Sequence, residues 1–390
     1  MAEKGGPLTV FLIAGEQSGD ALGAKLIRAL RQRRWNVRFL GVGGEAMEAE
    51  GLKSLFPMAD IAVMGFVPVI KRLFTLLSRI RMTARAAIEA KPDVVVIIDS
   101  PDFTHRVARK LRAALPGVPI VNYVSPTVWA WRPGRAAKMR SYVDHVLAVL
   151  PFEPEAHQRL GGPECSYVGH PLIERFAELR PRPEDALTRE FERHVLLLPG
   201  SRLSEVTRLM PVFGEAVARL AAAVPQASFS LPAVPHVADV IRAAMRDWPV
   251  KAEIVIGEQA KWTAFRRARA ALAASGTVTL ELGLAQVPMV TAYKVSPIEK
   301  KIIEALVTVS TPILPSLILS EKVVPEFLQE AATGEALAGA LLPLVTGGPE
   351  RSAQLAAFDR LDAAMAVTGG NPSAAAAEIV LYYAENGRRV

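Results

Sequence analysis

Two short runs of small and charged residues have the types and spacing to bind a nucleotide. Ser275-Gly276-Thr277 follows the apolar run 270–274 and precedes a helical pattern, so its backbone N–H groups would face a phosphate at the positive end of a helix dipole. Glu281 comes four residues after Thr277, about 6 Å along a helix at 1.5 Å per residue, where its carboxylate could accept hydrogen bonds from a ribose. Gly200-Ser201-Arg202 forms a second turn, whose arginine could neutralise a diphosphate unless it pairs with Glu205. Together the two turns favour a nucleotide ligand over chance helix capping.

Acidic residues in the first half of the chain supply the candidate catalytic groups. Asp99 follows the apolar run 94–98 and precedes a proline turn, where a partly buried carboxylate can act as a general base. Asp102 is expected to cap the next helix. The glycine-flanked turn 15–20 contributes Glu16 and Asp20 as further catalytic candidates, with helix capping as the alternative role for Asp20. The glycine-rich run 41–44 lacks the complete spacing of a dinucleotide-binding loop.

These candidates follow apolar runs that are typical of parallel β-strands. Such runs alternate with segments long enough for crossover helices, and ligands bind beyond the carboxyl ends of the strands in such sheets. The runs are 8–14, 37–40, 94–98, 120–123 and 145–149 in the first half, then 195–198, 228–231, 252–256, 270–274 and 289–292. The pattern predicts an α/β protein with two Rossmann-like, doubly wound parallel-sheet domains that face a cleft.

The expected domain boundaries follow from this alternation. Residues 1–172 form the N-terminal domain, the polar stretch 173–194 is a linker, and 195–350 form the nucleotide-binding domain. Residues 351–390 are helices that either fold back on the first domain or exchange with a second subunit, because both arrangements bury the same apolar face.

Composition narrows the class of protein. A chain of 390 residues that is 51% hydrophobic is long enough for two cores, and its single cysteine, Cys165, excludes an internal disulfide and suggests no zinc site. The first residues lack a secretion signal, so a cytoplasmic protein is expected. The longest uncharged run, 305–320, is too short and too rich in proline to span a membrane. The net charge of +7 is compatible with nucleic acid, an anionic membrane or a phosphorylated substrate.

One segment, 63–81, is strongly apolar yet contains four basic residues. A basic amphipathic segment can lie in the bilayer interface, with its apolar side chains inserted and its cations near lipid phosphates. The alternative is a helix that faces the core and has an ordinary solvated basic side. The residues expected to contact acyl chains are Phe66, Val67, Val69, Ile70, Leu73, Phe74 and Leu77.

Taken together, the motifs resemble those of the lipid-A-disaccharide synthase family over residues from about 8 to 330. The matching runs, in family order, are 15–20, 41–47, 99–103, 123–131, 168–172, 197–202, 275–281 and 288–294. The resemblance implies a glycosyltransferase of the GT-B type, a fold of two Rossmann-like domains. Such an enzyme joins UDP-2,3-diacylglucosamine to 2,3-diacylglucosamine 1-phosphate, with inversion, and releases UDP and a β-1,6 disaccharide in lipid A (lipopolysaccharide) biosynthesis. It would work on the cytoplasmic face of the inner membrane as a peripheral protein without a nucleic-acid partner. Both a monomer and a homodimer remain open.

The resemblance also implies residue roles. Asp99 would deprotonate the acceptor hydroxyl, and neither a metal nor a cofactor is required, since no Asp-x-Asp pair occurs. The donor would be bound by Gly200, Ser201, Arg202, Ser275, Gly276, Thr277, Glu281, Tyr293, Lys294, Glu326 and Gln329. Two positions depart from the family pattern: Ser316 stands where asparagine is usual, and Lys322 where arginine is usual. The Ser316 hydroxyl can still donate a hydrogen bond, but the two contacts that an amide could make are lost.

Two other function classes share part of this pattern. Another UDP-sugar enzyme of the same fold, such as a 2-epimerase or a muramyl-type transferase, would keep the nucleotide site but would not need the apolar basic segment. A non-enzymatic nucleotide-binding membrane adaptor would keep Arg202 and Glu281 but would have no use for Asp99.

Overall fold

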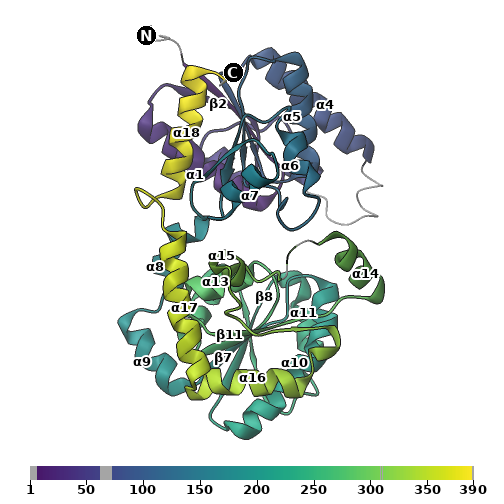
Figure 1. Cartoon of the computed structure of the whole chain (residues 1–390), viewed down its shortest axis with the longest axis vertical. Coiled ribbons are helices and arrows are strands. Elements are labelled where there is room, and N and C mark those ends of the chain that lie inside the picture. Colours follow the sequence, from purple (N-terminus) through teal and green to yellow (C-terminus); the bar gives the residue numbers. More distant parts are fainter. Residues whose placement is uncertain (1–6, 62–72, 308, 310, 389–390) are drawn as a thin grey trace. The chain divides into compact units, whose positions relative to one another are not determined.

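The chain folds into two compact units (Figure 1). The computed structural model describes residues 7–61, 73–307, 309 and 311–388. Residues Met1–Ile173 and Ala366–Val390 belong to the first unit, and Glu174–Met365 form the second. Within the described residues each unit contains a six-stranded sheet, and every strand pair is parallel. The expected fold class, two Rossmann-like α/β units, is confirmed.

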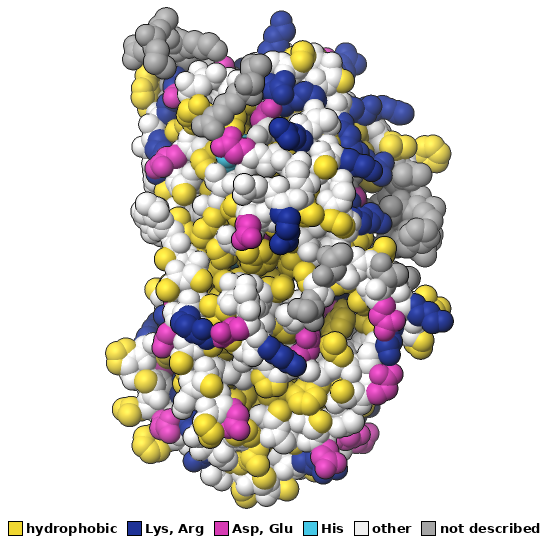
Figure 2. Space-filling view, viewed as in Figure 1, with side chains coloured by type: hydrophobic (Ala, Val, Ile, Leu, Met, Phe, Trp, Pro, Cys, Tyr) yellow, Lys and Arg dark blue, Asp and Glu magenta, His cyan; other side chains and the backbone are white. Residues whose placement is uncertain are grey.

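The first unit has the strand order β2-β1-β3-β4-β5-β6. Its central strand β3 is made of valine and isoleucine only and is buried throughout, as expected of a strand covered by helices on both faces. On the face shown in Figure 2, Lys and Arg side chains outnumber Asp and Glu over this unit. The strands are β1 (Leu8–Ala14), β2 (Val37–Val42), β3 (Val94–Ile98), β4 (Ile120–Tyr123), β5 (His145–Ala148) and β6 (Glu164–Tyr167). The helices are α1 (Gln17–Arg33), α2 (Glu45–Ala49), α4 (Leu73–Ala90), α5 (Pro101–Ala114), α6 (Gly134–Met139), α7 (Glu153–Arg159) and α18 (Pro372–Asn386).

The second unit has the strand order β12-β11-β10-β7-β8-β9. Because the sheet is parallel, the carboxyl ends of β7, β10, β11 and β12 lie along one edge. The strands are β7 (His194–Leu198), β8 (Ser228–Ala233), β9 (Glu253–Ile256), β10 (Ala270–Ala274), β11 (Met289–Tyr293) and β12 (Glu326–Leu328). The helices are α8 (Phe176–Leu179), α9 (Pro183–Glu192), α10 (Leu203–Ala223), α11 (Pro235–Ala244), α12 (Glu258–Arg267), α13 (Val278–Leu284), α14 (Pro297–Leu306), α15 (Leu314–Leu319), α16 (Gly334–Thr346) and α17 (Pro349–Met365).

The segment 173–194, expected as a linker, contains α8 and α9 and belongs almost entirely to the second unit. Arg189 of α9 is buried and donates hydrogen bonds to four backbone carbonyls, those of residues 265, 266, 285 and 286, at 2.6–2.9 Å. These carbonyls belong to the last turn of α12 and to the two residues that follow α13, where helix carbonyls need partners from outside the helix. The charged residues that suggested a linker therefore include Arg189, whose guanidinium caps the C-terminal ends of α12 and α13.

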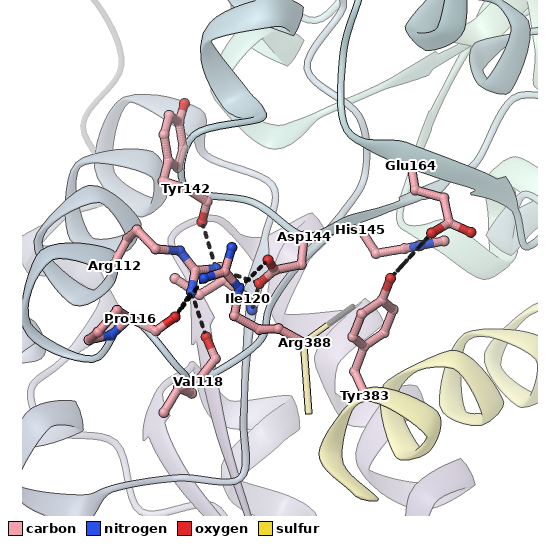
Figure 3. Close-up of polar contacts among 10 residues, drawn as sticks. All are labelled: Arg112, Pro116, Val118, Ile120, Tyr142, Asp144, His145, Glu164, Tyr383 and Arg388. Atoms are coloured by element: carbon pink, nitrogen blue, oxygen red, sulfur yellow. Dashed lines mark hydrogen bonds and ion pairs between the residues drawn. The ribbon is translucent and has the colours of Figure 1, made fainter. Parts of the chain in front are cut away.

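The C-terminal residues also differ from the expected boundaries. Helix α17 belongs to the second unit, whereas α18 packs against α1 of the first unit, where Val380 joins the apolar core (Figure 1). Figure 3 shows the polar contacts that fix this segment. The Tyr383 hydroxyl oxygen lies 3.2 Å from His145 Nδ1, and Arg388 Nε donates a hydrogen bond to Asp144 Oδ1 at 2.8 Å. In the structure, α18 thus packs on the first unit of its own chain.

Candidate functional site

The turn after β3 holds Asp99 in an uncommon conformation. Asp99 (φ +52°) and Ser100 (φ +45°) both occupy the left-handed region, which costs a non-glycine residue about 1 kcal/mol or more. The Asp99 carboxylate accepts hydrogen bonds from Ser18 Oγ at 2.9 Å and from the backbone N–H of Ser100 at 2.8 Å. Thr104 Oγ1 donates to the Asp99 carbonyl at 2.8 Å. The fold thus holds a strained turn that fixes the orientation of the half-buried Asp99 carboxylate. Strained backbone of this kind is concentrated at functional sites.

The neighbouring glycine turn brings a second carboxylate to the same sheet edge. Strands β1 and β3 pair, and a Cβ atom added to Gly15 would lie 2.5 Å from Ser100 Oγ, so only glycine permits the two turns to approach. Glu16 is half-buried, and burial, followed by the negative charges of Asp99 and Asp102, raises the pKa of its carboxyl group. Glu16 and Asp99 therefore form one acidic pair at the carboxyl end of the first sheet.

Asp20 has a different role from its neighbours. It is 4% exposed, and its carboxylate accepts three backbone N–H groups, from Gly44 at 2.7 Å, Ala46 at 2.9 Å and Met47 at 3.1 Å. These donors lie at the start of α2, so Asp20 caps a helix other than its own. This geometry favours the capping role over the catalytic one.

Sequence reasoning missed a buried carboxylate, Glu153, beneath the loop that follows β4. It accepts hydrogen bonds from Trp129 Nε1 at 3.1 Å and from the backbone N–H groups of Val149 at 3.1 Å and Leu150 at 3.0 Å. Burial raises the pKa of Glu153 to about 7. Its position in the first turn of α7 was the available sequence signal. Glu153 positions the tryptophan-containing loop.

In the second unit, the Ser-Gly-Thr turn connects β10 to α13. Ser275 Oγ donates to Glu326 Oε1 at 3.3 Å, and Thr311 donates to the other oxygen at 3.1 Å. Burial raises the pKa of Glu326. Gly276 has φ +153°, and a Cβ atom placed there would meet no atom within 4 Å, so the backbone is open to a ligand. The structure thus brings Ser275 and Glu326, 51 residues apart, to one edge of the sheet.

The turn after β7 is organised by Glu205. Its carboxylate accepts hydrogen bonds from the backbone N–H of Arg202 at 3.3 Å and from the Arg202 guanidinium at 3.1 Å, so the pairing anticipated as an alternative is present. Arg202 nevertheless remains 73% exposed and can reach a ligand. Gly200 has φ +106° and packs directly on Glu205, while the carbonyl of Ser201 accepts a hydrogen bond from His236 Nε2 at 2.9 Å. The turn presents one exposed guanidinium beside a backbone that Glu205 and His236 hold in place.

Glu281 lies on α13 and forms an ion pair that the sequence did not indicate. Lys261 Nζ of α12 lies 2.6 Å from its carboxylate, and the same ammonium lies 4.4 Å from the centre of the Trp262 ring. Both partners are largely buried, with side chains 27% and 21% exposed. Glu281 is therefore held in one orientation before any ribose could bind to it.

The remaining donor-site candidates lie around the ends of β11 and β12. Tyr293 is half-buried, and burial, followed by the charge of Glu205, raises the pKa of its hydroxyl group. Lys294 follows it directly. Gln329, in the left-handed region at φ +52°, accepts a hydrogen bond from the backbone N–H of Val295 at 3.1 Å.

The two positions that depart from the family pattern lie near this edge. Ser316 is buried and accepts a hydrogen bond from the backbone N–H of Val323 at 3.3 Å. The positive charge of Lys322 favours the ionised form of Glu326 and so opposes the effect of burial on its pKa.

The residues expected to touch acyl chains are only partly described. Phe66, Val67, Val69, Ile70 and the side chain of Leu73 lie outside the described residues. Phe74, at the start of α4, is 87% exposed, whereas Leu77 is half-buried. Arg79 pairs with Asp60 at 2.7 Å, so this cation serves the fold. Among the described helices none has the length and apolar character to cross a bilayer.

Comparison with known proteins identifies the relatives of this chain. Residues 10–380 match the family model described as lipid-A-disaccharide synthetase. A lipid-A-disaccharide synthase of Rhodopseudomonas palustris BisB18 is 56% identical over 374 residues, which cover 95% of this chain and 94% of that protein. The synthase of Rhodospirillum centenum is 43% identical over 385 residues, covering 96% and 94%.

Solved structures agree at the level of the fold. The UDP-GlcNAc 2-epimerase of Neisseria meningitidis, solved with UDP-GlcNAc bound, has a TM-score of 0.62 at 11% identity and covers 96% of this chain and 99% of its own. The glycotransferase of kitacinnamycin has a TM-score of 0.64 at 16% identity, covering 97% and 99%. The epimerase likeness extends to the fold alone, whereas the synthase likeness extends to the sequence of nearly the whole chain. The chain therefore belongs to the lipid-A-disaccharide synthase family, a family of glycosyltransferases in lipid A biosynthesis.

Proposed function

We propose that this protein is an inverting glycosyltransferase that joins UDP-2,3-diacylglucosamine to 2,3-diacylglucosamine 1-phosphate. The products would be the β-1,6-linked disaccharide 1-phosphate and UDP. Family membership supports the reaction class, and the names of relatives 43–56% identical favour a synthase over an epimerase. In this proposal the second unit holds the donor, and the first unit supplies the base.

Donor binding is assigned to the polar edge of the second sheet. The backbone at Gly276 is open to a diphosphate, and the exposed Arg202 guanidinium can neutralise the charge that develops on departing UDP. Glu281, held by Lys261, is the proposed ribose partner. Tyr293, Lys294, Glu326, Gln329 and the two turns 200–202 and 275–277 complete the proposed donor site.

The conformation of Asp99 carries the mechanistic part of the proposal. A strained left-handed turn aims its carboxylate, and Ser18 and the Ser100 N–H fix the orientation of that carboxylate. Asp99 would remove the proton from the acceptor 6-hydroxyl as that oxygen attacks the anomeric carbon of the donor and the bond to UDP breaks. Glu16 would stand beside the same hydroxyl as a second carboxylate. Asp20 is not part of this proposal, because its oxygens are committed to α2.

The test is acceptor-dependent release of UDP in detergent micelles by the wild type and by Asp99→Asn. We expect kcat to fall about 10²- to 10⁴-fold, the usual contribution of a general base, with UDP affinity unchanged. Glu48→Gln, an exposed carboxylate on α2, is the matched control and should retain wild-type activity. Release of UDP without acceptor would indicate a hydrolase, and full activity of Asp99→Asn would remove Asp99 from the mechanism.

Membrane contact and assembly are further parts of the proposal. We expect the 63–81 segment, with the exposed Phe74 at its described end, to hold the enzyme peripherally on the cytoplasmic face of the inner membrane. Phe74→Ser should then weaken binding to anionic vesicles, and equal binding of both proteins would contradict this. A homodimer with exchanged α18 would make the contacts of Figure 3 between chains, and light scattering tests for it.

A further inference from the structure

A basic pocket lies on the first unit, apart from the proposed donor residues. Its volume is about 420 Å³. Helix α5 forms one wall, and the opposite side comes from the loop after β4, helix α6 and Tyr142, which lies between α6 and β5. The charged residues of its lining are Asp102, Arg106, Arg109, Arg132 and Arg135.

The pocket has a large excess of positive charge. Four arginines face a single carboxylate, that of Asp102, whose side chain is 89% exposed and whose Oδ1 lies 3.9 Å from Arg135 Nη2. Within the described part of the chain, Arg106 and Arg132 have no acidic side chain within 4.0 Å. Arg106, Arg109 and Arg132 are exposed, so water screens their mutual repulsion, and their guanidinium groups are accessible to an anion that enters the pocket.

His105 does not add to the positive charge of the pocket. His105 is buried, and burial, with the charges of Arg135 and Arg109, lowers its pKa to about 3, so the ring is neutral at physiological pH. Its Nδ1 lies 3.0 Å from the Tyr142 hydroxyl. The ring therefore acts as a neutral support for Tyr142.

Aromatic rings hold two of the guanidinium groups in place. Arg109 lies over the Tyr142 ring, with its Cζ 4.9 Å from the ring centre, and Arg132 lies over Trp131 at 4.3 Å. Arg109 Nη2 also donates to the Tyr142 hydroxyl at 3.4 Å, and the remaining N–H groups of the two guanidinium groups can donate to the oxygens of a phosphate. Arg132 also has φ +54°, so its backbone is strained in the position that directs it to this pocket.

The position of the pocket relates it to Asp99. Asp102, Arg106 and Arg109 recur at helical spacing on one face of α5, over about 10 Å from the first to the last. Helix α5 begins two residues after Asp99. One sugar ring whose hydroxyl lies at Asp99 could therefore place a substituent on its opposite side among the first arginines.

We propose that this pocket binds the phosphomonoester of the acceptor sugar and so selects an acceptor that carries a 1-phosphate. The inference rests on the proposed function for the identity of the acceptor, and it adds the residues that recognise it. The diphosphate of the donor has its own proposed partners on the second unit, so the arginines of α5 and of the loop before α6 are available for a second phosphate.

The test compares two acceptors, 2,3-diacylglucosamine with and without its 1-phosphate, in the wild type and in the double variant Arg106→Gln/Arg132→Gln. Neither residue has an ion pair within the described residues, so folding should survive. We expect the wild type to prefer the phosphorylated acceptor about 10- to 100-fold in kcat/KM, the value of one or two charged hydrogen bonds. In the double variant this preference should fall to about unity, while KM for the UDP donor is unchanged.

The matched control is Lys110→Gln/Arg140→Gln, which removes the same charge from α5 and from the residue after α6, both outside the pocket lining. It should keep the wild-type preference. A double variant that also keeps the preference would overturn the inference. Loss of binding to phosphatidylglycerol vesicles with the preference intact would overturn it too, and would assign the pocket to a phospholipid headgroup.

A measurement without turnover separates this inference from the proposed function. Titration of the protein with glucosamine 1-phosphate, followed by phosphorus NMR, should give a dissociation constant at least about 10-fold weaker in the double variant than in the wild type. Equal affinity would overturn the inference whatever the enzyme assay shows. A wild type that binds glucosamine 1-phosphate through these arginines but releases no UDP with both substrates would instead refute the proposed function.

Discussion

Replacement of Asp20 should damage the fold and leave the chemistry intact. Its carboxylate is buried and accepts three backbone N–H groups at the start of α2, at 2.7, 2.9 and 3.1 Å. A helix cap contributes about 1 kcal/mol, and a partly buried charge at a helix N-terminus up to about 2 kcal/mol more. Asp20→Ala also leaves buried donors without acceptors. We therefore expect a loss of about 3–4 kcal/mol in the free energy of unfolding.

Asp20→Asn is the more specific test of the hydrogen bonds, because asparagine has nearly the same shape as aspartate. The single carbonyl oxygen of asparagine can accept hydrogen bonds from only some of the three N–H groups, and its amide N–H₂ faces another N–H group. We therefore expect a loss of about 2 kcal/mol in the free energy of unfolding. For a folding unit of about 200 residues, each kcal/mol lowers Tm by about 2–4 °C. The expected fall is therefore about 4–8 °C for Asp20→Asn and about 6–16 °C for Asp20→Ala.

The assay pairs thermal unfolding with UDP release and compares Asp20→Asn with Glu16→Gln. Because burial and neighbouring charges raise the pKa of Glu16, its neutral substitute should leave Tm unchanged or slightly higher while lowering kcat. Asp20→Asn should show the opposite pattern, a lower Tm with kcat within about 3-fold of wild type below the transition. A wild-type Tm with a kcat at least about 100-fold lower would refute the capping role and return Asp20 to the catalytic site.

Three further predictions concern other parts of the structure. Arg189→Met should lower the free energy of unfolding by about 3–5 kcal/mol, because four buried carbonyls lose their donor; a urea midpoint equal to wild type would contradict this. Glu153 has a raised pKa of about 7, so the native state binds its proton more tightly than the unfolded state does. Stability should therefore fall, relative to Glu153→Gln, as the pH rises from about 4.5 to about 7, and parallel pH profiles of urea unfolding would exclude this. Gly15→Ala would place a Cβ atom 2.5 Å from Ser100 Oγ and displace the turn that aims Asp99, so kcat should fall more than UDP affinity does, and unchanged kinetics would argue against that coupling.

Sequence patterns predicted most of the sheet framework because central strands are buried on both faces. Runs such as Val94–Ile98 are continuous and β-branched, and that pattern identified them. The strands that were missed, β6 and β12, each lie at one edge of a sheet and are short and partly polar. The opposite edge strands, β2 and β9, were predicted because they contain more apolar and β-branched residues.

The candidate site was predictable where chemistry follows a strand end, as at Asp99, Arg202 and Ser275. Partners far apart in sequence were not predictable, because their contacts depend on packing between elements. The pair Lys261–Glu281 is an example, since its two residues lie on different helices. Asp20 shows the same limit, because spacing indicated a cap but not that the capped helix begins 25 residues further along the chain.

The linkage in the product tests the central claim most directly. Wild-type protein would be incubated with UDP-2,3-diacylglucosamine and 2,3-diacylglucosamine 1-phosphate in micelles, and the product examined by NMR. The account predicts a disaccharide 1-phosphate joined β-1,6, formed in equal amount with UDP and lost in Asp99→Asn. A product with retained configuration, or UDP accompanied only by the free acylated sugar, would contradict it.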